Sequence, residues 1–277
     1  MAGYTGLELG PYGYMPLDEK ILNKELKSRN LKIVAGTMYD TLSNPDKLDY
    51  LFDKTDKICN LLSKLEDQTQ IDGLRYQPPY LVVIDEVNPI RSKTAGLYDE
   101  AKRLDETAWN HMMQNIRAIC KKAKSYGIRP VLHPHAGGYI EFEDEINKAA
   151  QDLDDDTIGF CLDTGHLYYS QMDPIELLDR YYARLDYLHF KDINLEIYKR
   201  ETKKHTGFFE SCALGVMCPI GEGIIPYDDI YTFLKKKHYK GYITIEQERD
   251  PRNSDTSLRD VKKSVDFLKK IGYETNV

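Results

Sequence analysis

Residues 158–166 of the chain read Ile-Gly-Phe-Cys-Leu-Asp-Thr-Gly-His, a continuous apolar run that ends in polar groups. Such a run predicts a strand of a parallel sheet, because both faces of such a sheet are covered by helices. Other segments follow the same pattern and are also predicted as strands: residues 6–10, 32–39, 80–87, 128–135, 185–193 and 242–248.

Amphipathic stretches lie between these runs and predict helices. Residues 105–126 carry Trp109, Met112 and Ile116 at helical spacing with charged residues opposite. Asp173 and Pro174 are typical of the cap and the first residue of a helix. The predicted helices are residues 45–66, 105–126, 173–183, 227–238 and 256–271.

The regular alternation of strands and helices favours either a (β/α)8 barrel or a doubly wound sheet. The strand pattern is one short of eight, and the chain opens directly on a predicted strand. We therefore expect an α/β fold of the (β/α)8 TIM-barrel type that lacks the first β-strand and helix, with residues 1–277 forming a single domain. An incomplete barrel has an exposed edge, which formation of a homo-oligomer could cover.

Composition excludes several classes of partner. The chain of 277 residues has 38 Lys and Arg against 45 Asp and Glu, a net charge of −7, which argues against nucleic acid. No apolar run of about 18 residues exists that could span a membrane. The five cysteines form no CxxC pair, and the first ten residues have no signal-peptide pattern. We expect a cytoplasmic protein with reduced thiols.

Polar side chains gather where the predicted strands end. These are the histidines and carboxylates His133, His135, His166, His189, Glu86, Asp163, Glu246 and Glu248. In a parallel barrel the carboxyl ends of the strands meet at one rim, where active sites lie. Carboxylate oxygens and imidazole nitrogens together are typical ligands of a catalytic divalent metal. The oxygen-rich set favours Mn²⁺, with Co²⁺, Mg²⁺ or Zn²⁺ as alternatives.

Each of these residues also has an ordinary structural interpretation. A single histidine at a strand end is more often hydrogen-bonded than metal-bound. Asp163 could cap the turn that follows it, and Glu246 could belong to an ion pair. Four strands that end in the same way at one rim nevertheless favour a functional site.

Four motifs in a fixed order resemble a known family. Asp163-Thr-Gly-His166, His189-Phe-Lys-Asp192 and Glu246-Gln-Glu-Arg-Asp-Pro251 follow His133-Pro-His-Ala-Gly-Gly138. The set resembles the xylose-isomerase-like TIM barrels of the sugar isomerase and epimerase type, and is most similar to the inosose dehydratase branch. The sequence Glu8-Leu-Gly-Pro and a long insertion at residues 194–223, between the last two strands, point to the same branch.

The resemblance implies four metal ligands, typically Glu, Asp, His and Glu. Asp163, His189 and Glu246 match the last three directly. The first glutamate has no clean match, because His133 stands where the epimerases place it. Glu141, eight residues further on, is the expected fourth ligand, and His133 is the alternative.

The resemblance also implies a reaction. We expect a metal-dependent lyase, a dehydratase, that acts on a keto-inositol or related keto-sugar through a metal-stabilised enediolate. His135 is the expected base, and Lys191 or His166 would donate to the leaving oxygen. The expected catalytic residues are thus His135, Lys191 and His133, and the expected substrate-binding residues are His166, Glu86, Glu248 and Arg249.

Three other functions stay open at this stage. A sugar isomerase or epimerase would use the same metal and the same first step. An endonuclease IV-like enzyme would need more histidines and a basic groove, which the charge of −7 disfavours. A non-catalytic paralogue, or a subunit that needs a partner, would follow from the absent first strand.

Overall fold

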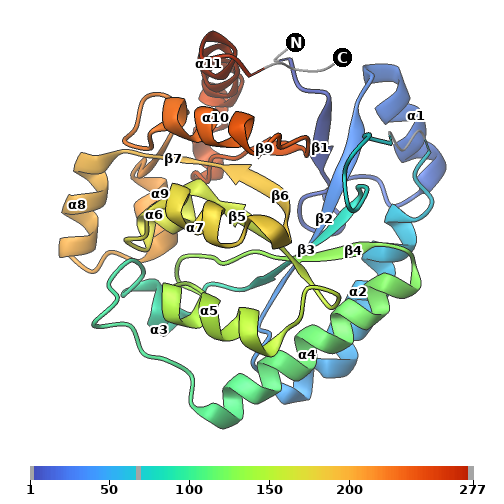
Figure 1. The fold of residues 1–277 in the computed structure, drawn as a ribbon, viewed down its shortest axis with the longest axis horizontal. Coiled ribbons are helices and arrows are strands. Elements are labelled where there is room, and N and C mark those ends of the chain that lie inside the picture. The colour runs from blue at the N-terminus through green and yellow to red at the C-terminus, as the bar shows by residue number, and fades with distance from the viewer. Residues whose placement is uncertain (1–2, 67–69, 274–277) are drawn as a thin grey trace.

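The computed structural model describes residues 3–66 and 70–273, and its centre is a parallel sheet that curls into a barrel (Figure 1). Neighbouring strands follow one another in chain order, β1-β2-β3-β4-β5-β6-β9, with no reversal of direction along the sheet. A doubly wound sheet would show such a reversal. The order therefore confirms the barrel-type fold with seven parallel strands. They are β1 (Gly6–Glu8), β2 (Lys32–Asp40), β3 (Tyr80–Asp85), β4 (Arg129–Leu132), β5 (Gly159–Asp163), β6 (Leu185–Phe190) and β9 (Ile243–Ile245).

Helices surround the sheet, and the predicted ones are present with slightly shorter bounds. Asp173 caps its helix as expected, since its carboxylate accepts the N–H groups of Ile175 and Glu176. The predicted helices correspond to α2 (Leu48–Leu62), α4 (Glu106–Ser125), α7 (Pro174–Arg180), α10 (Tyr227–Lys236) and α11 (Ser257–Lys270). The structure adds α1 (Glu19–Arg29), α3 (Pro89–Ser92), α5 (Glu143–Asp152), α6 (Thr164–Tyr169), α8 (Leu195–Lys203) and α9 (Phe208–Ala213). None of the helices that the structure describes is long and apolar enough to cross a membrane.

Side chains fill the inside of the barrel. Along β3, Tyr80, Val82 and Ile84 belong to the inner cluster, while the alternate residues Leu81 and Val83 face the helices. This two-residue alternation is the one expected of a barrel strand. The cluster is completed by Val34, Ala35, Val131, Cys161 and Tyr187. Because side chains fill the interior, a substrate-binding site is expected at the rim of the barrel.

The two edge strands face each other without pairing. Among the residues that the structure describes, β1 is hydrogen-bonded only to β2, and β9 only to β6. The Glu8 carboxylate reaches across the opening and accepts a hydrogen bond of 2.8 Å from the Tyr187 hydroxyl. Tyr187 in turn contacts the Thr244 hydroxyl of β9. Side chains therefore bridge the position where an eighth strand would complete the barrel.

The expected insertion contains two helices and a small hairpin-like sheet. β7 (Asp192–Ile193) and β8 (Met217–Cys218) pair antiparallel, and α8 and α9 lie between them in sequence. The Asp192 carboxylate accepts four backbone N–H groups, those of Ile193, Gly221, Gly223 and Ile225, at 2.9–3.1 Å. This carboxylate fixes the return of the insertion to the barrel rim.

Candidate active site

Four side chains meet at the carboxyl ends of the strands β4, β5, β6 and β9, whose ribbons are labelled in Figure 1. Ligand atoms of His133, Asp163, His189 and Glu246 all lie within 4.8 Å of one another. His189 Nδ1 is 3.1 Å from a Glu246 oxygen and 3.8 Å from Asp163 Oδ2. His133 Nε2 is 3.7 Å from the same Asp163 oxygen. We call these four residues the cation group.

Lys191 compensates the negative charge of the cation group. Its ammonium donates hydrogen bonds of 2.7 Å to Asp163 and 2.8 Å to Glu246, and its side chain is buried. Burial opposes the charge on Lys191, but the two carboxylates outweigh it and raise the pKa of the ammonium well above its usual value. The two carboxylates therefore hold Lys191 as a protonated hydrogen-bond donor, and its expected catalytic role stays a prediction.

The electrostatics of the cation group favour ionised carboxylates. Burial opposes charge on Asp163 and Glu246, but the Lys191 ammonium lowers the pKa of both groups well below the usual range. Burial also lowers the pKa of His133, which keeps its imidazole neutral. Burial opposes charge on His189, but Cys161, Glu8 and Glu246 outweigh it and raise the pKa of His189 well above its usual value. Metal ligation requires ionised carboxylates and neutral imidazoles, so a metal would have to displace the proton from Nδ1 of His189.

The chemistry of these donors fits a divalent cation. Nδ1 of His189 is buried and has no hydrogen-bond partner in the described part of the chain, although two carboxylates lie beside it. A buried polar atom without a partner is unusual and calls for an explanation such as a bound ion. Two oxygen and two nitrogen donors are a common ligand set of Mn²⁺, Co²⁺ or Zn²⁺.

The structure places Glu141 outside the cation group. Its carboxylate accepts hydrogen bonds from Arg91 at 3.0 Å, from the N–H groups of Gly96 and Gly137 at 2.7 and 2.9 Å, and from Ser170 at 3.1 Å. These contacts occupy both oxygens of a fully buried side chain. His133, the alternative fourth ligand, is the residue that the structure brings next to Asp163 and His189.

A second group lies beside the first and consists of His135, His166 and Glu248. Nε2 of His135 is 3.4 Å from one Glu248 oxygen, and Nε2 of His166 is 3.5 Å from the other. The two imidazole rings are tilted against each other with centroids 3.8 Å apart. Phe208 of the insertion covers both rings at 5.3 and 5.6 Å, which shields them from water.

One residue, Ala136, gives the two histidines opposite tautomers. The carbonyl of Ala136 lies 2.9 Å from Nδ1 of His135, so this nitrogen carries the proton and Nε2 has the free lone pair. The N–H of Ala136 donates to Nδ1 of His166 at 3.3 Å, so the proton of that ring is on Nε2. Burial holds the pKa of His166 well below its usual value and keeps it in this neutral form. The second group therefore presents one acceptor and one donor to the same space.

Glu86 and Arg249 lie apart from both groups. The Glu86 carboxylate contacts the hydroxyl of Thr41. The Arg249 guanidinium donates to Asp260 at 2.8 Å and to Gln247 at 2.6 Å. Arg249 nevertheless lines a pocket of about 480 Å³ beside Glu248, together with Phe209, Cys212, Ala213, Asp250, Pro251 and Arg252.

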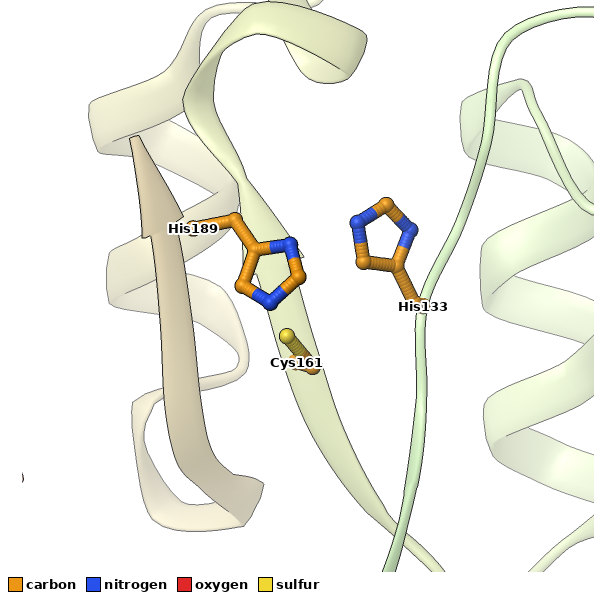
Figure 2. A group of neighbouring side chains, drawn as sticks. All are labelled: His133, Cys161 and His189. Carbon is orange, nitrogen blue, oxygen red and sulfur yellow. The ribbon is translucent and has the colours of Figure 1, made fainter. Parts of the chain in front are cut away.

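Two residues of the site escaped the sequence analysis. Glu8 lies at the end of β1, and its carboxylate is 2.6 Å from Nε2 of His189. Cys161 shares a face of β5 with Asp163, and its sulfur forms a further potential ligand set with His133 and His189 (Figure 2). Glu8 is a carboxylate within the predicted strand at residues 6–10, and the structure ends that strand at Glu8, where the other site residues also lie on their strands.

Comparisons with known proteins find relatives that cover most of the chain. The inosose dehydratase of Bacillus velezensis is 27% identical over 251 residues, which cover 91% of this chain and 79% of that protein. The inosose dehydratase of Lactiplantibacillus plantarum is 29% identical over 252 residues with the same coverage of 91% and 79%.

Solved structures share the fold. A crystal structure of the IolI protein with a bound zinc atom superimposes with a TM-score of 0.71 at 15% identity and covers 98% of this chain and 90% of that chain. The probable 3-DHS dehydratase AsbF of Bacillus anthracis gives a TM-score of 0.68 at 16% identity, with coverage of 97% and 89%. The model of the xylose isomerase-like TIM barrel family matches residues 1–271, and the chain therefore belongs to this family.

Proposed function

We propose that this protein is a divalent-metal-dependent dehydratase that acts on a keto-inositol or related keto-sugar in the cytoplasm. The observation that carries the proposal is the cation group, whose ligand atoms lie within 4.8 Å of one another beside a second group of opposite tautomers. The inosose dehydratases that match 91% of the chain support the choice of reaction. The buried, unpaired state of all five cysteines supports a reducing compartment.

His133, Asp163, His189 and Glu246 would hold the metal, for which Mn²⁺ is the first candidate. The chemistry that such an ion supplies when bound is polarisation of a carbonyl oxygen, which acidifies the neighbouring C–H bond. Lys191 adds a fixed positive charge to the same side of the site through its contacts with Asp163 and Glu246.

His135 is the proposed base. Its Nε2 carries the free lone pair and accepts the proton from the carbon next to the carbonyl. The C–O bond to the β-hydroxyl then breaks, a C=C bond forms, and the same proton leaves with the hydroxyl as water. The Glu248 carboxylate, 3.4 Å from Nε2, stabilises the intervening imidazolium. Nε2 of His166 is buried and has no hydrogen-bond partner among the described residues, so it would be free to donate to a substrate hydroxyl.

The pocket beside Glu248 favours an uncharged substrate. Its two guanidinium groups are already paired, Arg249 with Asp260 and Arg252 with Asp250. The Glu248 carboxylate adds negative charge to the lining. A phosphate or carboxylate group would therefore find no free cation among the residues that line this pocket, whereas a polyol would find hydrogen-bond partners.

An assay against keto-inositols and ketohexoses, with Mn²⁺, Co²⁺, Mg²⁺ or Zn²⁺ added, tests the proposal. We expect a product whose mass is lower than that of the substrate by one water. An unchanged mass together with a new isomer would favour the sugar isomerase or epimerase that shares this site. Absence of turnover with every metal and substrate would contradict both.

The role of His135 is tested separately. We expect His135→Ala to lower kcat by at least about 100-fold, the typical contribution of a general base. His111→Ala is the matched control, because His111 lies on the outer helix α4, and it should keep full turnover. Near-normal turnover of His135→Ala would exclude His135 as the base.

A further inference from the structure

Glu8 connects the first strand to the cation group. Its Oε1 lies 2.6 Å from Nε2 of His189 and 2.8 Å from the hydroxyl of Tyr187, and its Oε2 lies 3.4 Å from the hydroxyl of Thr37. The side chain is largely buried, and burial opposes its charge, but His189 outweighs burial and lowers the pKa of Glu8 below its usual value. Glu8 is therefore an ionised acceptor directed at one nitrogen of His189.

This contact decides which nitrogen of His189 is free. A metal-bound imidazole keeps one ring proton, and the Glu8 carboxylate at 2.6 Å holds that proton on Nε2. Nδ1 then presents its lone pair to the space beside Glu246 and Asp163, which lie at 3.1 and 3.8 Å. Histidines that bind metals commonly donate their second ring N–H to a carboxylate in this way.

The contact between Glu8 and His189 also affects a second possible metal site, which contains a sulfur ligand. His133 and His189 also approach the sulfur of Cys161, and the three potential ligand atoms lie within 4.8 Å of one another. Figure 2 shows one nitrogen of His189 directed toward His133 and the other toward the Cys161 sulfur. If the proton left Nε2, His189 could turn its lone pair toward a thiolate-containing site, which thiophilic ions such as Zn²⁺ prefer.

We propose that Glu8 is the positioning residue that directs Nδ1 of His189 into the oxygen-rich cation group and keeps His189 from the sulfur-containing alternative. This inference rests on the proposed function, because it assumes that the cation group binds a divalent metal. It assigns metal selectivity to a residue of the edge strand β1, outside the ligand set itself.

Titration of the metal-free protein with Mn²⁺ alone and with Zn²⁺ alone, followed by calorimetry, tests the inference. We expect Glu8→Ala to weaken Mn²⁺ binding about 10–100-fold, the usual cost of losing a partner of a metal-bound histidine. Zn²⁺ binding should weaken less, because Cys161 becomes available. In the double variant Glu8→Ala/Cys161→Ala, Zn²⁺ binding should weaken as much as Mn²⁺ binding. Cys161→Ala alone should leave Mn²⁺ binding unchanged.

Glu8→Gln separates positioning from folding. Its amide oxygen still accepts from Nε2 of His189, so Mn²⁺ binding should remain closer to that of the wild type than in Glu8→Ala. Equal losses in the two variants, or wild-type affinity in Glu8→Ala, would overturn the inference.

The ring N–H protons of His189 in the metal-free protein provide a readout that does not depend on metal. The Nε2–H proton should resonate far downfield in the wild type, because the Glu8 carboxylate lies 2.6 Å from this nitrogen, and should lose this shift in Glu8→Ala. An unchanged resonance would overturn the positioning role. If the wild type binds no metal but shows this difference, the proposed function fails while the positioning contact stands.

Discussion

Glu141 illustrates how a residue near a site can be structural. Its buried carboxylate pairs with Arg91, which also binds Glu145 at 2.7 Å, so the three side chains form a closed ion network. Sequence spacing alone could not separate Glu141 from His133, because the network depends on Arg91, 50 residues earlier in the chain.

The two residues can be distinguished by substitution. We expect Glu141→Gln to lower the free energy of unfolding by about 1–3 kcal/mol, because Arg91 loses a charged partner. Mn²⁺ affinity should stay unchanged in this variant. His133→Ala, by contrast, should lower Mn²⁺ affinity. Urea unfolding and metal titration measure the two effects, and loss of Mn²⁺ binding in Glu141→Gln would return Glu141 to the ligand set.

Asp85 predicts a pH dependence of stability. Burial raises the pKa of its carboxyl to about 6, although the N–H groups of Leu42 and Tyr139 partly oppose this. Between pH 3.8 and about 6 the folded protein therefore holds a proton that the unfolded chain has lost. The contribution of Asp85 to stability is thus largest at low pH and falls by about 3 kcal/mol as the pH rises through this window.

Asp85→Asn isolates this effect, because its amide does not titrate. The difference in free energy of unfolding between wild type and variant should change between about pH 4 and about pH 7, with the wild type losing stability relative to the variant as the pH rises. A difference that is independent of pH would contradict the assignment.

At the scale of elements, the apolar runs, the long amphipathic stripes and the seven-residue α7 with its Asp173-Pro174 cap were predictable. Most of the other short helices and the 11-residue α1 were not. The strand runs were predicted a few residues too long at their carboxyl ends, as at β4, because polar residues such as His133 and His135 continue beyond the last ladder pair. The helices α5, α6, α8 and α9 have at most 10 residues, too few for a clear helical stripe. Their positions depend on tertiary contacts, such as the packing of Phe208 against the histidines.

The end of the insertion, where the chain comes back to the barrel rim, requires a glycine at position 223. A Cβ atom at Gly223 would lie 2.2 Å from the Asp192 carboxylate and 2.6 Å from the carbonyl of Ile193. We expect Gly223→Ala to displace the carboxylate from its backbone partners and to make the segment around β8 sensitive to limited proteolysis. Gly127→Ala is the control, since a Cβ there meets no atom within 4 Å and only its positive φ of 73° adds strain. Equal protease resistance of the two variants would contradict this role of Gly223.

At the scale of the whole molecule, the site and the opening of the barrel are linked. Glu8 of β1 contacts both Tyr187 and His189 of β6, so one carboxylate bridges the opening and orients a proposed ligand. The number of strands and the rim could be predicted from the sequence, because each strand carries its own signal. The contacts of Glu8 with Tyr187 and His189 could not be predicted, because these residues lie 179 and 181 positions after Glu8 in the sequence.

Metal binding should therefore stabilise an edge of the sheet. Within the described part of the chain, β9 pairs only with β6, and its residues are only partly buried. Its amides should therefore exchange with solvent faster than those of the fully buried strands β3 and β5. Glu246 follows β9 directly and would join it through the ion to His133, Asp163 and His189. We expect Mn²⁺ to slow hydrogen exchange in residues 243–246, as measured by mass spectrometry, and to have no such effect in His189→Gln. Exchange in β9 that Mn²⁺ leaves unchanged in the wild type would show that Glu246 is not a ligand.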